Sequence, residues 1–416
     1  MSKEPIQFLK VEPWSITEEG FDPIRSRVSE SLFSLANEYL GSRGYFEEGY
    51  SSDHLQGVYF NCLYDIQDVS HDQLFRGQVT QTEFMVNTVD WLYTRISIDG
   101  EQLDLAKSKF SGFVRSTDFR TAAMTRSFVW TTKSGKKTKM TFVRFMSIHN
   151  RHVAAQRIIL EPLNHSTPAT ITLGSDFNTL HELAEGWKQV EEETGAGYQP
   201  KGKCLWKNAT SKEESGTYAI MAETQRSGIH LFSAFRYSAP GAKKTSNEQR
   251  DKFIGVSFTL PLAQGVAATV DRTAAFFWKL TDSKTAWKSG METAKALKKE
   301  TYDSLFSDHA AAWAKIWETL DITIDGDDVI QQGVRYCLFQ FYQSYFGADP
   351  RANILCKGMT GEVYSGWVFW DTESYCIPVY LFTNPAAARM LLQFRYNLLP
   401  VAMRRAKDLG CKGARI

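Results

Sequence analysis

Apolar and polar residues alternate with a period of two over much of the first two-thirds of the chain, from about Gly57 to Lys279. In residues 91–101 (WLYTRISIDGE) the alternation ends in a turn at Asp99-Gly100. A second turn, at residues 134–136, joins two more alternating runs as in an antiparallel hairpin. Short strands at this spacing predict a large antiparallel β-sandwich, and the lack of βαβ alternation argues against a Rossmann or barrel architecture.

The period changes to that of a helix near Lys284. A single apolar stripe at i, i+3/i+4, i+7 spacing consists of Tyr302, Leu305, Phe306, His309, Trp313, Ile316, Trp317 and Leu320. His309, Trp313 and Trp317 could form a ligand box, but a stripe at helical spacing usually packs against a neighbouring element. We therefore predict a linker helix that lies on a larger element and assign these three residues no role in a site.

Helices are predicted to continue after this linker. One begins with Asp327 or Asp328 as its cap, and another begins at Asn384-Pro385, where Pro occupies the first helical position. Pro400 is expected to start a further short helix that ends at Gly410. The chain is thus predicted to hold a β-sandwich domain over residues 1–280, a helical linker over 281–326 and an all-α segment over 327–416.

Charge and hydropathy narrow the class of protein. The 48 Lys and Arg residues nearly balance the 47 Asp and Glu residues, which gives a net charge of +1. This leaves no bulk positive field to attract nucleic acid or an anionic membrane, so neither partner is expected. The start of the chain lacks a signal core and no apolar run reaches the roughly 18 residues of a spanning helix, so we expect a cytoplasmic protein.

Cysteine spacing gives no sign of a metal site. The chain has six cysteines: Cys62, Cys204, Cys337, Cys356, Cys376 and Cys411. They form no CxxC motif and no Cys/His pair at the spacing of metal ligands, so no metal is expected. Buried free thiols in a reducing compartment are the predicted state.

The candidate chemistry lies in a glycine-rich loop, residues 357–373 (KGMTGEVYSGWVFWDTE). An aromatic plane under the C–H face of a sugar, beside a carboxylate that accepts hydrogen bonds from two adjacent hydroxyls, is a common sugar-binding arrangement, and Trp370 with Asp371 has this chemistry. The same pair could instead be a structural helix start, with Asp371 as the cap and Trp370 buried. Both interpretations remain open at this stage.

Asp371 and Glu373 also invite a hydrolase interpretation with one general acid and one general base. On a helix the two side chains point about 200° apart, and on an extended chain they lie about 7 Å apart under one side of a sugar. An inverting mechanism needs groups on opposite faces of the ring. The pair therefore remains a weak alternative.

Several blocks of sequence resemble glycoside hydrolase family 65. They are residues 30–49 (ESLFSLANEYLGSRGYFEEG), 332–340 (QGVRYCLFQ), 366–373 (GWVFWDTE), 380–389 (YLFTNPAAAR) and 395–400 (RYNLLP). The resemblance implies a large amino-terminal antiparallel β-sandwich, a helical linker and an (α/α)₆ barrel that holds the active site. It also implies inversion of configuration and an α-linked glucose disaccharide as substrate.

The activity that the resemblance implies is phosphorolysis to β-glucose 1-phosphate, with inorganic phosphate as co-substrate and no cofactor. Tyr364, Trp370 and Asp371 match positions that line the pocket for the non-reducing glucose: Asp371 accepts hydroxyl hydrogen bonds and Trp370 forms the apolar wall. The alternatives are an α-glucoside hydrolase of the same family and a non-catalytic carbohydrate-binding module. A homodimer is expected for the complete protein.

Two positions depart from the family pattern, and the barrel is expected to be incomplete. Glu38 stands where the opening signature usually has Gly, and Trp367 stands where phosphorylases often have His, as either a packed aromatic or an acceptor-sugar platform. Twelve barrel helices need roughly 200 residues, whereas residues 327–416 supply 90. The family's acid Glu is thus expected beyond Ile416, so we predict no catalytic residue here and an inactive chain by itself.

Overall fold

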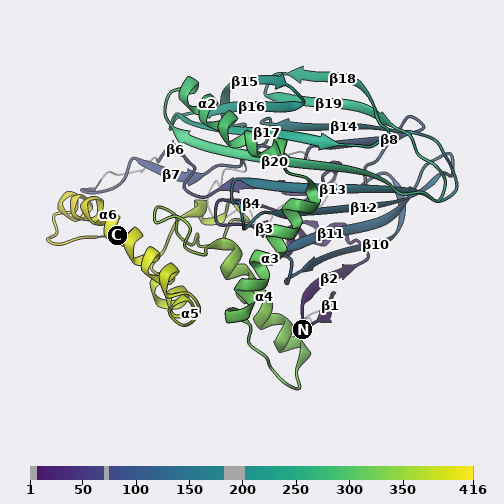
Figure 1. Ribbon diagram of the computed structural model, residues 1–416. Helices are drawn as coiled ribbons and strands as arrows, with labels where there is room; N and C mark the ends of the chain where they lie inside the picture. The colour runs from purple at the N-terminus through teal and green to yellow at the C-terminus, as the bar shows by residue number, and fades with distance from the viewer. Residues whose placement is uncertain (1–6, 70–74, 182–201, 416) are drawn as a thin grey trace.

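The computed structural model describes residues 7–69, 75–181 and 202–415 (Figure 1). Its main body is a sandwich of two β-sheets, and every pairing between the described strands is antiparallel. In sheet order, the ten strands of the larger sheet are β1 (Leu9–Glu12), β2 (Ser15–Glu19), β10 (Lys109–Asp118), β11 (Ala123–Thr131), β12 (Lys137–Met146), β13 (Val153–Pro162), β20 (Ala268–Leu280), β17 (Ile229–Ser238), β16 (Thr217–Thr224) and β15 (Trp206–Glu214). The five strands of the smaller sheet are β18 (Lys243–Arg250), β19 (Phe253–Leu260), β14 (Ala169–Asp176), β8 (Thr94–Ile98) and β9 (Glu101–Gln102). The predicted antiparallel sandwich is confirmed.

Both predicted turns join paired strands. Phe128 of β11 lies opposite Met140 of β12, and Ile98 of β8 lies opposite Glu101 of β9. Between the latter two strands, Asp99 and Gly100 have φ of 56° and 75°, the left-handed conformations that a two-residue hairpin loop requires. Two small sheets complete the β structure: β3 (Leu35–Ala36), β4 (Leu40–Ser42) and β5 (Val58–Phe60), and the pair β6 (Tyr64–Asp68) and β7 (Gln81–Met85).

Helices cover the outer face of the ten-stranded sheet. Figure 1 shows α2 (Ser283–Ala294) and α3 (Tyr302–Leu320) lying across this face. Alanines such as Ala155, Ala234 and Ala275 on the strands leave room for the helices. Gly290 of α2 packs so closely that a Cβ there would lie 2.2 Å from Cγ of Phe232. The middle strands are therefore apolar on both faces.

The apolar stripe of α3 packs as predicted. The Trp317 indole N–H donates to the carbonyl of Phe119 at 2.7 Å, and Trp313 is fully buried. His309 stacks on the Phe145 ring with 4.7 Å between centroids and accepts a hydrogen bond from a backbone N–H through Nδ1. These residues join the helix to the sheet.

Helices α4 and α6 begin at the predicted cap residues, and α6 is longer than predicted. Asp327 caps α4 (Asp328–Ser344), and Asn384 caps α6 (Pro385–Asp408). The prediction that Pro400 starts a new helix is wrong, because Pro400 lies inside α6. Proline removes one backbone hydrogen bond, but buried alanines on both sides of it keep α6 continuous. The other helical segments are η1 (Pro23–Arg25), α1 (Ser26–Leu32), η3 (Lys295–Lys298), η4 (Val363–Gly366), the π-helical turn η5 (Thr372–Cys376) and α5 (Ile377–Thr383).

The prediction of buried thiols is wrong for two cysteines. Cys337 and Cys411 are exposed, and the other four are partly buried. Cys337 lies off the buried stripe of α4, which includes Arg335, Leu338 and Phe339. Within the described ranges, no helix is both long enough and apolar enough to cross a membrane.

Buried arginines hold an acidic segment inside the sandwich. Arg126 on β11 donates to Glu48 at 2.7 Å and to Glu47 at 2.8 Å, and all three side chains are fully buried. Arg144 on β12 donates to Glu47 at 3.1 Å and to the carbonyl of Arg43 at 2.7 Å. Burial by itself would raise the pKa of Glu47, but the guanidinium groups of Arg144 and Arg126 hold that pKa below its ordinary value. The carboxylate therefore stays charged in the core.

The same segment also joins the sandwich to the helices. Glu38 is fully buried, and its carboxylate accepts hydrogen bonds at 2.8 to 3.0 Å from the backbone N–H groups of Phe346, Ala348 and Asp349. Its φ of 65° is the left-handed conformation that favours glycine, which explains why Gly fits this position in the family signature. The Glu38 carboxylate thus makes three hydrogen bonds that Gly could not make, and these offset the strain in the Glu38 backbone.

We expect Arg126→Met to lower the free energy of unfolding by roughly 3–5 kcal/mol, because it leaves two carboxylates buried with one guanidinium lost. Urea unfolding followed by circular dichroism measures this. Lys212→Met is the control, since Lys212 forms an exposed ion pair with Glu214 and should cost less than about 1 kcal/mol. Equal losses in the two variants would contradict the role given to the buried arginines.

Stability should also fall at acidic pH because of His309. Burial lowers its pKa to about 4 in the folded chain, whereas an unfolded histidine titrates near about 6.5. As the pH falls from about 6.5 towards about 4, the unfolded chain binds a proton that the folded chain does not, so up to roughly 3 kcal/mol of stability is lost. His309→Gln should flatten this part of the curve in urea titrations between about pH 4 and 7. Parallel curves for the two proteins would refute this origin.

Candidate functional site

The glycine-rich loop leading to Trp370 is held by side chains of the amino-terminal domain. Arg43 donates to the carbonyl of Thr360 at 2.6 Å. Tyr59 on β5 donates to the Glu362 carboxylate at 3.0 Å, and Nδ1 of His181 lies 3.3 Å from the same oxygen. The side chains of Arg43, Tyr59, His181 and Glu362 are buried, which limits the access of water to these contacts. The amino-terminal domain therefore fixes the first half of the loop.

The second half of the loop makes a left-handed turn. Tyr364, Ser365 and Gly366 have φ of 59°, 56° and 67°, a conformation that residues with a Cβ rarely adopt in sequence. The Tyr64 hydroxyl donates to the carbonyl of Gly366 at 2.7 Å, which supports the turn from β6. A Cβ on Gly366 would lie 2.6 Å from Cβ of Met85, so only glycine fits against β7.

Tyr364 is the first predicted site residue on this turn. Its side chain is 38% exposed, and its ring meets Phe369 edge to face with 6.0 Å between centroids. The Lys357 ammonium lies 5.4 Å from the centre of the Tyr364 ring. Tyr364 therefore presents part of its ring at the surface within a group of aromatic residues.

Trp370 and Asp371 both face the surface. Trp370 is 68% exposed, and Asp371 is exposed as well. Asp371 stands at the start of the π-helical turn η5, but its side chain makes no capping hydrogen bond to the described backbone. The interpretation of Asp371 as a cap beside a buried Trp370 is therefore wrong. Both side chains are available to a ligand.

Glu373 differs from Asp371 in its partners. Arg395 on α6 binds both Glu373 oxygens, with Nε at 2.7 Å and Nη2 at 2.9 Å. Because both of its oxygens already accept hydrogen bonds from Arg395, Glu373 is engaged in a structural contact, which disfavours the acid–base pair of Asp371 and Glu373. Burial, with the nearby charges of Asp371 and Glu373, raises the pKa of Cys376 to about 11, so this thiol is protonated at neutral pH.

Trp367 has features of both of its predicted roles, a packed aromatic and a platform for the acceptor sugar. Its indole N–H donates to the carbonyl of Glu83 at 2.6 Å, while its side chain is 41% exposed. The hydrogen bond orients the ring, and the exposure leaves part of one face free for contact. Further exposed aromatic and apolar side chains on the adjoining η5, α5 and α6 are Tyr375, Leu381, Phe382, Leu392, Tyr396, Leu399, Val401 and Met403.

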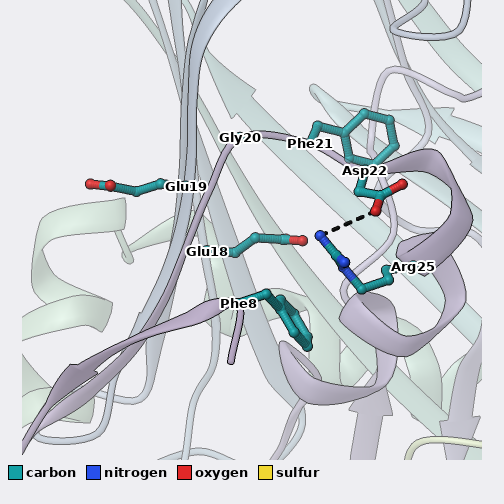
Figure 2. Close-up of a pocket in the computed structure, with 7 residues that line it drawn as sticks. All are labelled: Phe8, Glu18, Glu19, Gly20, Phe21, Asp22 and Arg25. Carbon is teal, nitrogen blue, oxygen red and sulfur yellow. Dashed lines mark ion pairs between the residues drawn. The ribbon is translucent and has the colours of Figure 1, made fainter. Parts of the chain in front are cut away.

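Two hollows elsewhere on the surface lack the chemistry of this loop. One hollow, of about 190 Å³, lies beside β2, and Arg25 pairs there with Asp22 at 3.1 Å. In Figure 2 the Glu18 side chain points towards this pair. Glu18 is already bound by the buried Arg115. The other, of about 410 Å³, is lined by residues 148–151 with Phe346 and Ala348. Neither includes a predicted site residue, and the described residues contain no cluster of three or more side chains able to hold a metal.

Several residues that shape this surface were not predicted as site residues, although Arg43 lies in a block that resembles the family. Arg43, Tyr59 and Tyr64 lie some 300 positions before the loop they support. Arg395 lies in a block that resembles the family, but nothing in its spacing linked it to Glu373. A pattern of nearby residues could not have identified them.

Two parts of the chain match two domains of the same protein family. Residues 16–316 match the profile "Glycosyl hydrolase family 65, N-terminal domain", and residues 335–416 match "Glycosyl hydrolase family 65 central catalytic domain". Helices α4 to α6 therefore form part of an (α/α)₆ domain, whose helices normally pack against one another. This explains the apolar surface of α5 and α6.

Similar proteins include the alpha,alpha-trehalose phosphorylase of Thermoanaerobacter brockii, 29% identical over 99% of this chain and 53% of its own length. The kojibiose phosphorylase of Halothermothrix orenii is 30% identical over 96% of this chain and 49% of its own. A solved structure, "Putative kojibiose phosphorylase from human microbiome", superposes with a TM-score of 0.89 at 33% identity and covers 99% of this chain and 52% of that one. The chain spans about half the length of the curated relatives it matches.

The left-handed turn gives a direct test. Gly366→Ala should destabilise the chain by about 1 kcal/mol or more, because the added methyl group meets Met85 at a positive φ. Gly361→Ala in the same loop is the control, since its Cβ would make only an ordinary contact 3.7 Å from Arg43. Thermal unfolding compares the two variants. A Gly366→Ala protein as stable as the control would show that the turn does not depend on glycine.

Proposed function

The chain belongs to glycosyl hydrolase family 65, and from this premise we propose that it binds the non-reducing glucose of an α-glucosyl disaccharide for inverting phosphorolysis. The observation that carries the proposal is that Trp370 and Asp371, neighbours in the chain, are both exposed, and that the Asp371 carboxylate makes no capping hydrogen bond. The turn that holds them is supported from the amino-terminal domain and from α6. The names of the relatives, phosphorylases of trehalose, kojibiose and maltose, favour phosphate over water as the attacking group.

In the proposed reaction, inorganic phosphate attacks the anomeric carbon from the face opposite the glycosidic bond. The glycosidic oxygen leaves with a proton from a general acid, and the products are β-glucose 1-phosphate and the released sugar. Inversion follows from this single displacement. The family resemblance assigns the acid to a Glu in a part of the central domain that these residues do not include, and no cofactor takes part.

Each predicted site residue has a role in holding the glucose. Asp371, a carboxylate with no capping bond, accepts hydrogen bonds from two neighbouring hydroxyls. Trp370 lies under the apolar C–H face of the ring, and Tyr364 lines the same surface. We place the reaction in the cytoplasm, where inorganic phosphate is available.

Asp371 provides the test of this function. Asp371→Ala should lower kcat/KM for phosphorolysis by roughly two to four orders of magnitude with the melting temperature unchanged, because the sugar hydroxyls lose a charged acceptor. Asp371→Asn should also be impaired, since an amide offers one acceptor oxygen where the carboxylate offers two. The assay follows β-glucose 1-phosphate formed from maltose, kojibiose, nigerose and trehalose by the complete gene product.

Two kinds of result would contradict this proposal. Turnover that persists when phosphate is omitted, with glucose as product, would indicate a hydrolase. Near wild-type turnover by Asp371→Asn, or unfolding of Asp371→Ala, would mean that Asp371 is structural and that the site is wrongly placed.

A further inference from the structure

Arg395 contacts the proposed sugar-binding turn at both of its ends. Its Nη2 donates to the carbonyl of Phe369 at 2.7 Å and to Glu373 at 2.9 Å, and its Nε donates to the other Glu373 oxygen at 2.7 Å. Phe369 immediately precedes Trp370, and Glu373 follows Asp371 by two positions. One side chain of α6 therefore spans the short segment that carries both proposed sugar contacts.

The planar guanidinium of Arg395 gives these hydrogen bonds a fixed geometry. A guanidinium is a rigid plane with five N–H donors, so three simultaneous hydrogen bonds fix the carbonyl and the carboxylate relative to each other. The Arg395 side chain is only 12% exposed, which limits competition from water. An ammonium group has the same charge but no fixed plane, and it cannot hold both acceptors in this geometry.

The backbone that begins between these two acceptors and continues to Cys376 is irregular, and the Arg395 contacts support its first part. Residues Thr372–Cys376 form a π-helical turn, and the Trp370 carbonyl accepts from both Glu373 at 3.1 Å and Ser374 at 3.2 Å. A π-helical turn holds one residue more than an α-helical turn. If it relaxed to a regular α-helix, the residues before it would rotate by about 100° around the axis. Trp370 and Asp371 would then point elsewhere.

We propose that Arg395 is a positioning residue that sets the direction of Trp370 and Asp371 and thereby the affinity for the glucosyl unit, an inference that rests on the proposed function for its ligand. Arg395 does not touch the sugar. It acts by binding both the Phe369 carbonyl and the Glu373 carboxylate, so the π-helical turn keeps its geometry while Trp370 and Asp371 remain exposed.

The test compares Arg395→Lys with Arg404→Lys, an exposed arginine on the same helix. In Arg395→Lys, hydrogen–deuterium exchange of the amides of residues 370–377 should speed up by about tenfold or more, with the melting temperature unchanged. In the complete gene product, KM for the disaccharide should rise by about 10- to 100-fold and KM for phosphate should stay the same.

The two measurements distinguish failure of this inference from failure of the proposed function. Unchanged exchange in Arg395→Lys, or equal increases in KM for disaccharide and phosphate, would overturn the positioning role. Faster exchange in a protein whose wild type turns over no α-glucosyl disaccharide would overturn the proposed function and leave the role of Arg395 in ordering the turn intact. Arg404→Lys should match the wild type in both measurements.

Discussion

The structure depends on charged groups that are satisfied inside the sandwich. Arg126 and Arg144 project from neighbouring strands into the core, where they bind Glu47, Glu48 and backbone carbonyls of the preceding residues. A buried charge without a partner is costly, so these groups specify one position for the acidic segment. That segment continues into Glu38 and Arg43, which bind the helical part of the chain. The packing of one domain thereby sets the place of the next.

The candidate site is a consequence of this arrangement. Its loop is not stabilised by regular structure of its own, since it contains a left-handed turn followed by a π-helical turn. Tyr59 and Tyr64 hold it from the small strands β5 and β6, and Arg395 holds it from α6. Support from both sides allows the backbone to keep conformations that an isolated peptide would avoid. Aromatic side chains of this loop are therefore exposed on a backbone that is hydrogen-bonded from both sides.

Local patterns predicted those elements whose stability is local. The hairpin of β11 and β12 follows from alternation and a glycine turn, and the starts of α4 and α6 follow from Asp327 and Asn384. The continuity of α6 through Pro400 was not predictable, because contacts on both sides of the proline outweigh the hydrogen bond it removes. The exposure of Cys337 likewise depends on which face of α4 meets the sandwich.

By itself, the sequence determined the antiparallel sandwich, the change to helices near Lys284 and the family resemblance that named the candidates Tyr364, Trp370 and Asp371. Periodicity, caps and motifs are properties of neighbouring positions, so they can be read without the fold. The tertiary structure decided that the Asp371 side chain caps no helix and that Glu373 is bound by Arg395. It also decided that Glu38, whose own backbone has a conformation suited to glycine, binds three backbone N–H groups. The Glu373 and Glu38 contacts join groups far apart in the chain, whose approach is set by packing and by the cost of leaving a buried charge without a partner.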